Sequence, residues 1–266
     1  PADGALMVQA VNTRHIAHID CPGGGQVWVD GTTLYIGHMR YPHGTTVVDV
    51  ADPANPRVLA TIEMPKGWHS HKVRVANDLM IVNHEHQGAN GEAEFDGGLA
   101  IYDVANPAKP SLITKWTTPG NSVHRYDFDG RYAYMSPTAE GYLGNIVMIL
   151  DLADPANPRL VSSGNQGGKR PYPTHTCLPF RDPLGGRDIL VVADEDVAKL
   201  RPHAPAFSWI YDITDETNPM PIATFQVEGL DTDGSPQPPM TGCHQPSERF
   251  AGSVIPFAWF AQGLRL

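Results

Sequence analysis

The stretch Val47-Val-Asp-Val-Ala-Asp-Pro-Ala-Asn-Pro56 returns three more times along the chain. The copies are Ile101-Tyr-Asp-Val-Ala-Asn-Pro-Ala-Lys-Pro110, Ile149-Leu-Asp-Leu-Ala-Asp-Pro-Ala-Asn-Pro158 and Ile210-Tyr-Asp-Ile-Thr-Asp-Glu-Thr-Asn-Pro219. Because proline cannot donate a hydrogen bond to a sheet, the proline-rich half is expected to end one strand and turn the chain into the next. Asp and Asn side chains are expected to stabilise this turn through hydrogen bonds to the backbone.

The spacing of the copies predicts the fold. Their leading aspartates, Asp49, Asp103, Asp151 and Asp212, are 54, 48 and 61 residues apart. Two short apolar stretches precede each copy and one follows it, so each repeat contains four candidate strands. A repeat of about 50 residues built from strands is typical of a β-propeller. We therefore predict an all-β protein with a single propeller domain over residues 1–266.

The two ends of the chain are expected to complete the ring. Residues 255–260 and 263–266 read as strands of a last blade, and Thr13-Arg-His-Ile-Ala-His-Ile19 reads as a strand without a partner. If residues 12–20 supply the missing fourth strand, they remove an open sheet edge. The prediction is then five four-stranded blades, with approximate ranges 25–63, 68–118, 121–165, 174–229, and 241–266 plus 12–20.

These repeats resemble the LVIVD-repeat family, propeller proteins of bacteria and archaea. The most specific segments are Trp68-His-Ser-His-Lys-Val73, Thr174-His-Thr-Cys-Leu-Pro179 and Ala258-Trp-Phe-Ala-Gln-Gly-Leu-Arg265, and the resemblance covers essentially the whole chain. The resemblance implies an additional repeat between the third and fourth blades, where this chain has a short linker from Val161 to Thr174. A missing segment there would make six or seven blades. The family implies a fold and little about activity.

Composition narrows the class of partner. The 266 residues carry a formal net charge of −10, which argues against nucleic acid or an anionic membrane as the main partner. No apolar run reaches the roughly 18 residues of a transmembrane helix. The three cysteines lack metal or disulfide spacing, so a reducing, cytoplasmic location is expected. A secreted form is also compatible, because the chain begins at Pro1. We expect a small-molecule substrate and leave the oligomeric state open.

Four of the 12 histidines follow the repeat. His71, His124, His175 and His244 each precede the first strand of a blade, at intervals of 53, 51 and 69 residues, and Gln26 takes this position in blade one. The first strands of a propeller are innermost, so equivalent residues converge on the axis. The four imidazoles are therefore predicted to meet near one mouth of the channel.

This arrangement predicts a mononuclear metal site. Imidazole suits iron, copper and zinc, and we prefer Fe(II), with copper or zinc as alternatives. The site is similar to that of the carotenoid-cleavage oxygenases, in which four propeller histidines hold non-haem iron. Glu85 and Glu195 follow the second strands of blades two and four and are candidates for orienting carboxylates or a catalytic base. Glu140 and Glu248 are the nearest equivalents in blades three and five.

Other side chains near the predicted centre are candidates for a substrate pocket. They are Trp68, His69, His84, His86 and Tyr126. Strand alternation places His69 on the same side as His71, so either histidine could be the ligand.

Three functions remain open at this level. The first is an iron oxygenase or oxidoreductase that acts on a small apolar or aromatic substrate. The second is a zinc-type hydrolase or lyase, in which a metal-bound hydroxide attacks with Glu85 or Glu195 as base. The third is a non-catalytic propeller whose mouth binds a ligand or a protein. The repeated histidines would then have a structural role, as hydrogen bonds between neighbouring blades.

Overall fold

The computed structural model describes residues 11–21, 23–86, 97–118, 122–142, 144–164, 174–195, 206, 208–227, 242–249 and 252–266. Regular structure in these residues is almost entirely β-strand, which confirms the all-β prediction. The helix among them, η1 (Phe260–Gln262), is a short 3-10 turn. None of the described helical structure has the length and apolar character required to cross a bilayer.

The strands form five antiparallel sheets. Blade one contains β1 (Gly24–Asp30), β2 (Thr33–His38), β3 (His43–Asp49) and β4 (Arg57–Glu63). Blade two contains β5 (Trp68–His69), β6 (Val73–Ala76), β7 (Leu79–His86), β8 (Gly98–Asp103) and β9 (Ser111–Thr117), and both β5 and β6 pair with β7. Blade three contains β10 (Val123–Phe128), β11 (Tyr132–Pro137), β12 (Val147–Asp151) and β13 (Arg159–Gly164). Blade four contains β14 (Thr174–Pro179), β15 (Ile189–Asp194), β16 (Ser208–Asp212) and β17 (Met220–Phe225). Blade five contains β18 (Gln245–Pro246), β19 (Phe257–Ala258) and β20 (Leu264–Arg265).

The repeated aspartate–proline motif forms the turn between the third and fourth strands of blades one to four. Asp49 ends β3 and accepts a hydrogen bond on Oδ1 from the backbone N–H of Ala51, at 2.9 Å. Asp103, Asp151 and Asp212 accept the equivalent bond from the residue two positions later. The same local bonding therefore returns in each repeat, as expected for turns stabilised by side-chain carboxylates.

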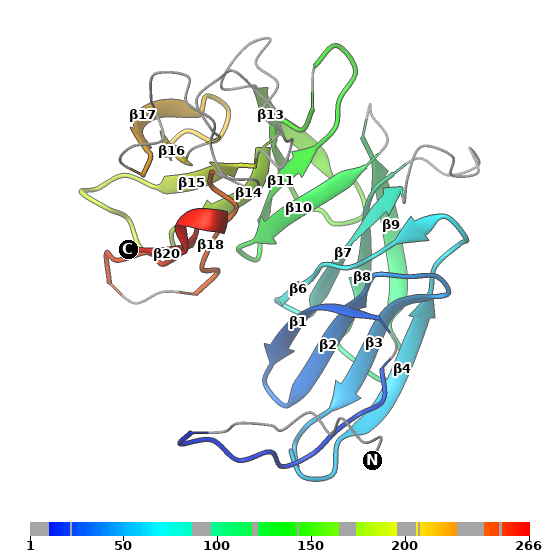
Figure 1. Cartoon of the computed structure of the whole chain (residues 1–266). Coiled ribbons are helices and arrows are strands. Elements are labelled where there is room, and N and C mark those ends of the chain that lie inside the picture. The colour runs from blue at the N-terminus through cyan, green and yellow to red at the C-terminus, as the bar shows by residue number, and fades with distance from the viewer. Residues whose placement is uncertain are drawn as a thin grey trace.

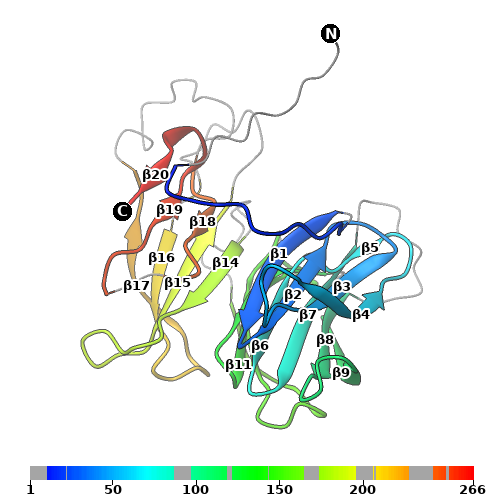
Figure 2. The same cartoon turned by 90° about the horizontal axis from the view of Figure 1, so that it is seen from below.

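The five sheets are arranged around a common centre, with the first strand of each sheet innermost (Figures 1 and 2). Consecutive inner strands contact one another from β1 and β6 through β10 and β14 to β18. This arrangement confirms the five-bladed propeller.

The last blade differs from the prediction. Its sheet contains three strands among the described residues, in the order β18-β19-β20. Residues 11–21 contain no strand, and Figure 1 shows this dark blue segment below β1–β4, apart from β18–β20. The expected fourth strand at residues 12–20 is thus not part of the sheet. Side chains connect blade five to blade one instead: Glu248 accepts a hydrogen bond from Gln26, and the Arg249 guanidinium lies 4.8 Å from the centre of the Trp28 ring.

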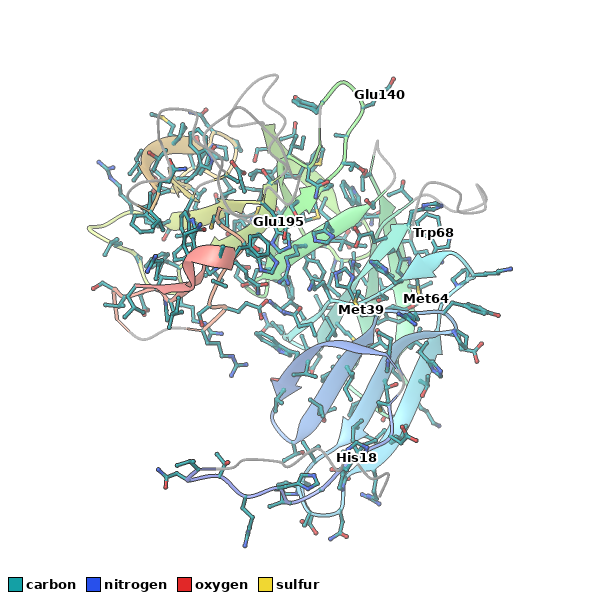
Figure 3. The ribbon with its side chains drawn as sticks, viewed as in Figure 1. His18, Met39, Met64, Trp68, Glu140 and Glu195 are labelled. Carbon is teal, nitrogen blue, oxygen red and sulfur yellow. The ribbon has the colours of Figure 1, made fainter. Side chains whose placement is uncertain are left out.

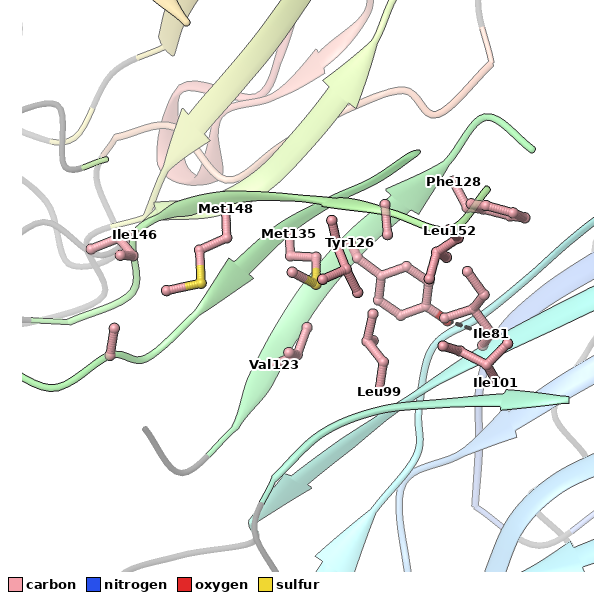
Figure 4. Packing of buried hydrophobic residues seen from close by; sticks show 13 residues of the cluster. Ile81, Leu99, Ile101, Val123, Tyr126, Phe128, Met135, Ile146, Met148 and Leu152 are labelled. Carbon is pink, nitrogen blue, oxygen red and sulfur yellow. Dashed lines mark hydrogen bonds between the residues drawn. The ribbon is translucent and has the colours of Figure 1, made fainter. Parts of the chain in front are cut away.

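Apolar side chains fill the spaces between successive blades. The cluster in Figure 4 joins blades two and three through residues such as Ile81, Leu99, Met135 and Ile146, all nearly inaccessible to water. Equivalent clusters lie between blades one and two, three and four, and four and five. Both faces of a propeller sheet are covered by neighbouring sheets. This explains why the second and third strands are continuous apolar runs rather than alternating ones.

Candidate functional site

Four histidines from four blades lie side by side in the inner strands or directly beside them. Ring centres are 5.5 Å apart for His71 and His124, 4.9 Å for His124 and His175, and 4.6 Å for His175 and His244. His71 and His175 are buried, whereas the side chains of His124 and His244 keep 29% and 31% of their surface exposed. The row is therefore reachable by small molecules at two positions.

A β-bulge aims His124 and His175 at the axis. In blade three, Val123 pairs with Pro137 and Arg125 with Ser136, so His124 is the extra residue. In blade four, His175 is the extra residue between Thr174 and Thr176. The pairing of blade two also shifts between His69 and Val73, and that of blade one between Gly24 and Val27. A bulge redirects side chains, so the bulged residue and its successor can both face the centre.

Polar side chains on the second strands hold the bulges in place. Asn83 Oδ1 accepts a hydrogen bond from the backbone N–H of Lys72, and Asn83 Nδ2 donates to the carbonyl of Val123 in the next blade. Ser136 acts in the same way in blade three: its hydroxyl accepts from the N–H of Arg125 and lies 2.8 Å from the carbonyl of His175. Each second strand thus ties its own bulge to the neighbouring blade.

Blade one reaches the site through its backbone. The N–H of Gln26 donates to the carbonyl of His71 at 2.9 Å. A Cβ on Gly37 would lie 2.7–2.8 Å from backbone atoms of Ser70 and His71, closer than real contacts allow. Glycine is needed there because two backbones approach closely.

Glu85 on β7 is the centre of a histidine cluster. Its Oε2 lies 2.7 Å from His69 Nε2 and 3.6 Å from His71 Nδ1, and its Oε1 lies 2.8 Å from His124 Nδ1. Burial opposes ionisation, but hydrogen bonds from His124 and His69 hold the pKa of Glu85 at about 2. A carboxylate with so low a pKa accepts protons poorly, which does not favour the predicted role of Glu85 as catalytic base.

Glu195 forms a second cluster. Its Oε1 lies 3.2 Å from His244 Nε2 and 3.9 Å from His175 Nε2. Burial raises the pKa of Glu195 above its usual value. The ring of His244 also stacks on Phe260 of η1, with ring centres 4.7 Å apart. Figure 3 shows Glu195 near the centre of the ring and Glu140 on the loop that leaves β11, so Glu140 does not contribute to this cluster.

Three imidazoles of the row, those of His71, His175 and His244, are held in their neutral form. Burial, and then the charge of Lys72, lower the pKa of His71 to about 2. Burial and the charge of Arg125 hold the pKa of His175 far below its usual value, and burial lowers that of His244 to about 4. Neutral imidazole is the form that binds metals.

Three cations beside the histidines were not predicted from the sequence. Arg74 contacts Asp127 at 2.8 Å and Glu248 at 2.9 Å, and Arg125 donates from Nε to His175 Nε2 at 3.2 Å. Lys72 is 7% exposed, and no hydrogen bond to its ammonium group occurs within the described part of the chain. Burial, followed by the charge of Arg125, lowers the pKa of Lys72 to about 7. Lys72 and Arg125 directly follow His71 and His124. This repeated basic residue was the sequence signal that could have placed both cations near the histidines.

The predicted pocket residues separate into different environments. His69 belongs to the Glu85 cluster. Trp68 and His86 form a cross-strand pair adjacent to the His69–Glu85 pair, and therefore face the opposite side of the sheet, with ring centres 5.0 Å apart. His84 shares that side and is buried. Tyr126 lies in the core between blades two and three, where its hydroxyl donates to the carbonyl of Ile81 (Figure 4).

The buried cysteines do not have thiolate character. Burial raises the pKa values of Cys177 and Cys243 far above the usual thiol range. Cys177 Sγ donates instead to the carbonyl of Met135 at 3.4 Å. Neither thiol is suited to act as a nucleophile at neutral pH.

Comparison with known proteins supports the fold. The LVIVD repeat model matches residues 24–62, which correspond to blade one, and residues 93–118, which include β8 and β9. These two segments are similar to LVIVD repeats. No curated protein sequence matches the chain significantly.

Among solved structures, this propeller is similar to the periplasmic gluconolactonase PpgL of Pseudomonas aeruginosa, with a TM-score of 0.55 and 16% identity over 86% of this chain and 60% of that one. The N-terminal domain of Nup159 has a TM-score of 0.44 and 8% identity over 80% of this chain and 56% of that one. The C-terminal domain of P. aeruginosa PilY1 has a TM-score of 0.45 and 15% identity over 85% of this chain and 53% of that one. The chain thus spans little more than half the length of these proteins. The first likeness shows the propeller fold.

Proposed function

We propose that this propeller is a metal-dependent enzyme and that a divalent transition metal binds to His124, His175 and Glu195, beside His244. The observation that carries the proposal is a group of three donor atoms, one from each of His124, His175 and Glu195, that lie within 4.8 Å of one another. The expected four-histidine set is thereby changed. Glu195 joins the ligands, and His71 belongs to the neighbouring Glu85 cluster.

The hydrogen bonds of the two imidazoles support this ligand set. His124 Nδ1 donates to Glu85, which leaves Nε2 as the nitrogen that can bind a metal, and His175 Nε2 accepts a hydrogen bond from Arg125, so its lone pair is on Nε2. Metal-bound histidines commonly donate their other N–H to an oxygen in this way. Arg125, which donates to His175 Nε2, must turn aside when that nitrogen binds a metal.

Hydrolysis is the reaction class that the surroundings favour. A bound metal supplies an activated water and a Lewis acid. Lys72 and Arg125 place positive charge beside the histidine row, where it stabilises an oxyanion that develops in the transition state. Zinc hydrolases use two histidines and a glutamate as ligands. The gluconolactonase among the structural neighbours is a reason to test lactones first.

An iron-dependent oxygenase is the second candidate, because two histidines and one carboxylate are also the ligand set of non-haem Fe(II) oxygenases. The two reactions are separated by their consumption of dioxygen. Turnover of a substrate with stoichiometric oxygen uptake favours the oxygenase, and turnover without oxygen uptake favours the hydrolase.

Metal analysis of the full chain is the first test. We expect bound zinc or iron in protein purified without added metal, and loss of that metal in His175→Ala. His86→Gln is the matched control, because His86 faces the other side of β7 from Glu85. Lactones and esters are then assayed with the loaded protein. Absence of metal in the wild type, together with no gain on reconstitution, would refute the proposal and leave a binding scaffold.

A further inference from the structure

A second cluster of metal-binding side chains lies next to the first, within blade two. His69 is on β5, His71 is at the bulge before β6, and Glu85 is on β7. Each offers one donor atom, and the three atoms lie within 4.8 Å of one another. Both histidines are buried. This cluster contributes no ligand to the metal proposed above. The two clusters are connected by the hydrogen bond between Glu85 and His124.

The hydrogen bonds of Asn83 define which nitrogen of His71 carries the lone pair. The backbone N–H of Lys72 is always a donor, so the atom of Asn83 that it contacts at 2.9 Å must be the carbonyl oxygen. The amide nitrogen of Asn83 therefore faces Val123 O at 3.1 Å and His71 Nδ1 at 3.4 Å. His71 Nδ1 is thus an acceptor without its own proton.

Two acceptors consequently face each other. His71 Nδ1 lies 3.6 Å from Glu85 Oε2, and neither atom brings a proton to this contact. Facing lone pairs repel each other unless a cation lies between them. Two ligands bound to a tetrahedral zinc ion at its usual bond lengths are about 3.3 Å apart. The separation of His71 Nδ1 and Glu85 Oε2 is close to this value. His69 Nε2, at 2.7 Å from the same oxygen, donates a hydrogen bond in the metal-free protein and must lose that proton and move away from Glu85 when a metal binds.

We propose that His69, His71 and Glu85 bind a second divalent transition-metal ion, so that this mouth of the propeller holds a two-metal centre. Glu85 joins the two halves, because one of its oxygens faces the second ion and the other accepts the hydrogen bond from His124. This inference extends the function proposed above and rests on it for the first ion.

The test is a count of zinc ions bound by the full chain. Protein stripped with a chelator is titrated with Zn²⁺ in a calorimeter, and the bound zinc is measured after dialysis. We expect two equivalents for the wild type, one for His69→Ala, one for His175→Ala, and none for the double variant. His69→Gln, which keeps a polar side chain next to Glu85, is included in case His69→Ala folds poorly. His86→Gln is the control and should retain both equivalents.

The outcomes separate the two proposals. One equivalent in the wild type that persists in His69→Ala and His69→Gln would overturn the second site and leave the first intact. Two equivalents that both persist in the His69 variants would overturn this ligand assignment. No bound zinc in the wild type would refute the proposed function as well. Loss of one equivalent in the His69 variants, with unchanged circular dichroism, supports the two-metal centre.

Discussion

Replacement of Arg74 by methionine should lower the free energy of unfolding strongly, because Arg74 joins several blades around the axis. Its side chain is 2% exposed and contacts Asp127 of blade three and Glu248 of blade five. Its guanidinium also lies 4.7 Å from the centre of the Trp28 ring in blade one. Methionine retains the length of the side chain but leaves Asp127 without its cation and leaves Glu248 with the longer contact to Arg125, at 3.4 Å.

The expected loss follows from the burial of the two carboxylates. Removal of one partner from a buried ion pair costs about 3–5 kcal/mol. The side chains of Asp127 and Glu248 keep 14% and 21% exposure, so water compensates in part and the lower end of that range applies. At about 2–4 °C per kcal/mol for a domain of this size, a loss of about 3 kcal/mol lowers Tm by roughly 6–12 °C.

The loss should depend on pH. Burial raises the pKa of Asp127 even beside Arg74, and removal of the guanidinium raises it further, with Glu248 as the other nearby charge. A carboxyl group whose pKa is higher in the folded state favours folding at low pH and opposes it at high pH. The difference between the variant and the wild type should therefore shrink as the pH falls through the raised pKa of Asp127 in the variant.

Urea unfolding followed by tryptophan fluorescence measures this effect. Arg57→Met is the control, because Arg57 also pairs with an aspartate, Asp49, but its side chain is 75% exposed. We expect little change in that variant. Asp127→Asn combined with Arg74→Met should cost less than the sum of the two single changes. Equal unfolding free energies for Arg74→Met and Arg57→Met would refute the reasoning.

Three further predictions test the packing around the site. Gly37→Ala should cost about 1–3 kcal/mol, because its Cβ would collide with the backbone of His71, whereas Gly164→Ala, with no atom near its Cβ, should be neutral in thermal unfolding. Tyr126→Phe should lose about 1 kcal/mol through the hydrogen bond to Ile81 and leave zinc binding unchanged, whereas a change in zinc affinity would place Tyr126 at the site after all. A thiol reagent should modify only Cys21 in the native protein and all three cysteines after denaturation, and rapid reaction of Cys177 or Cys243 would contradict their burial.

The fold could be predicted because its signals are local and repeated. The carboxylates of Asp49, Asp103, Asp151 and Asp212 form the same bond to a backbone N–H two residues later, so each turn needs only its own short segment. The repeat register also identified which histidines occupy equivalent positions. The prediction of a strand at residues 12–20 was wrong. The alternating pattern of this segment shows that it can pair with a sheet edge, but not that the edge of the last blade lies close enough to it.

The chemistry of the site depends on the local strand geometry, which the register of the sequence repeat does not predict. Bulges at His124 and His175 turn the following residue toward the axis as well, which is how Arg125 comes to lie beside His175. Tyr126, two residues after His124, falls instead into the core between blades. One residue of offset in an inner strand thus decides between the axis and the core.

The sequence by itself determined the repeat, its turns and the equivalent positions of His71, His124, His175 and His244, because hydrogen bonds within a repeat and apolar periodicity are local properties. Tertiary structure alone decided the partners of these histidines. Glu85 meets residues from two blades and Glu248 meets residues from three others. Such contacts depend on how far each blade extends toward the axis and on which side chains the neighbouring blades bury. Both are determined only when all the blades pack together.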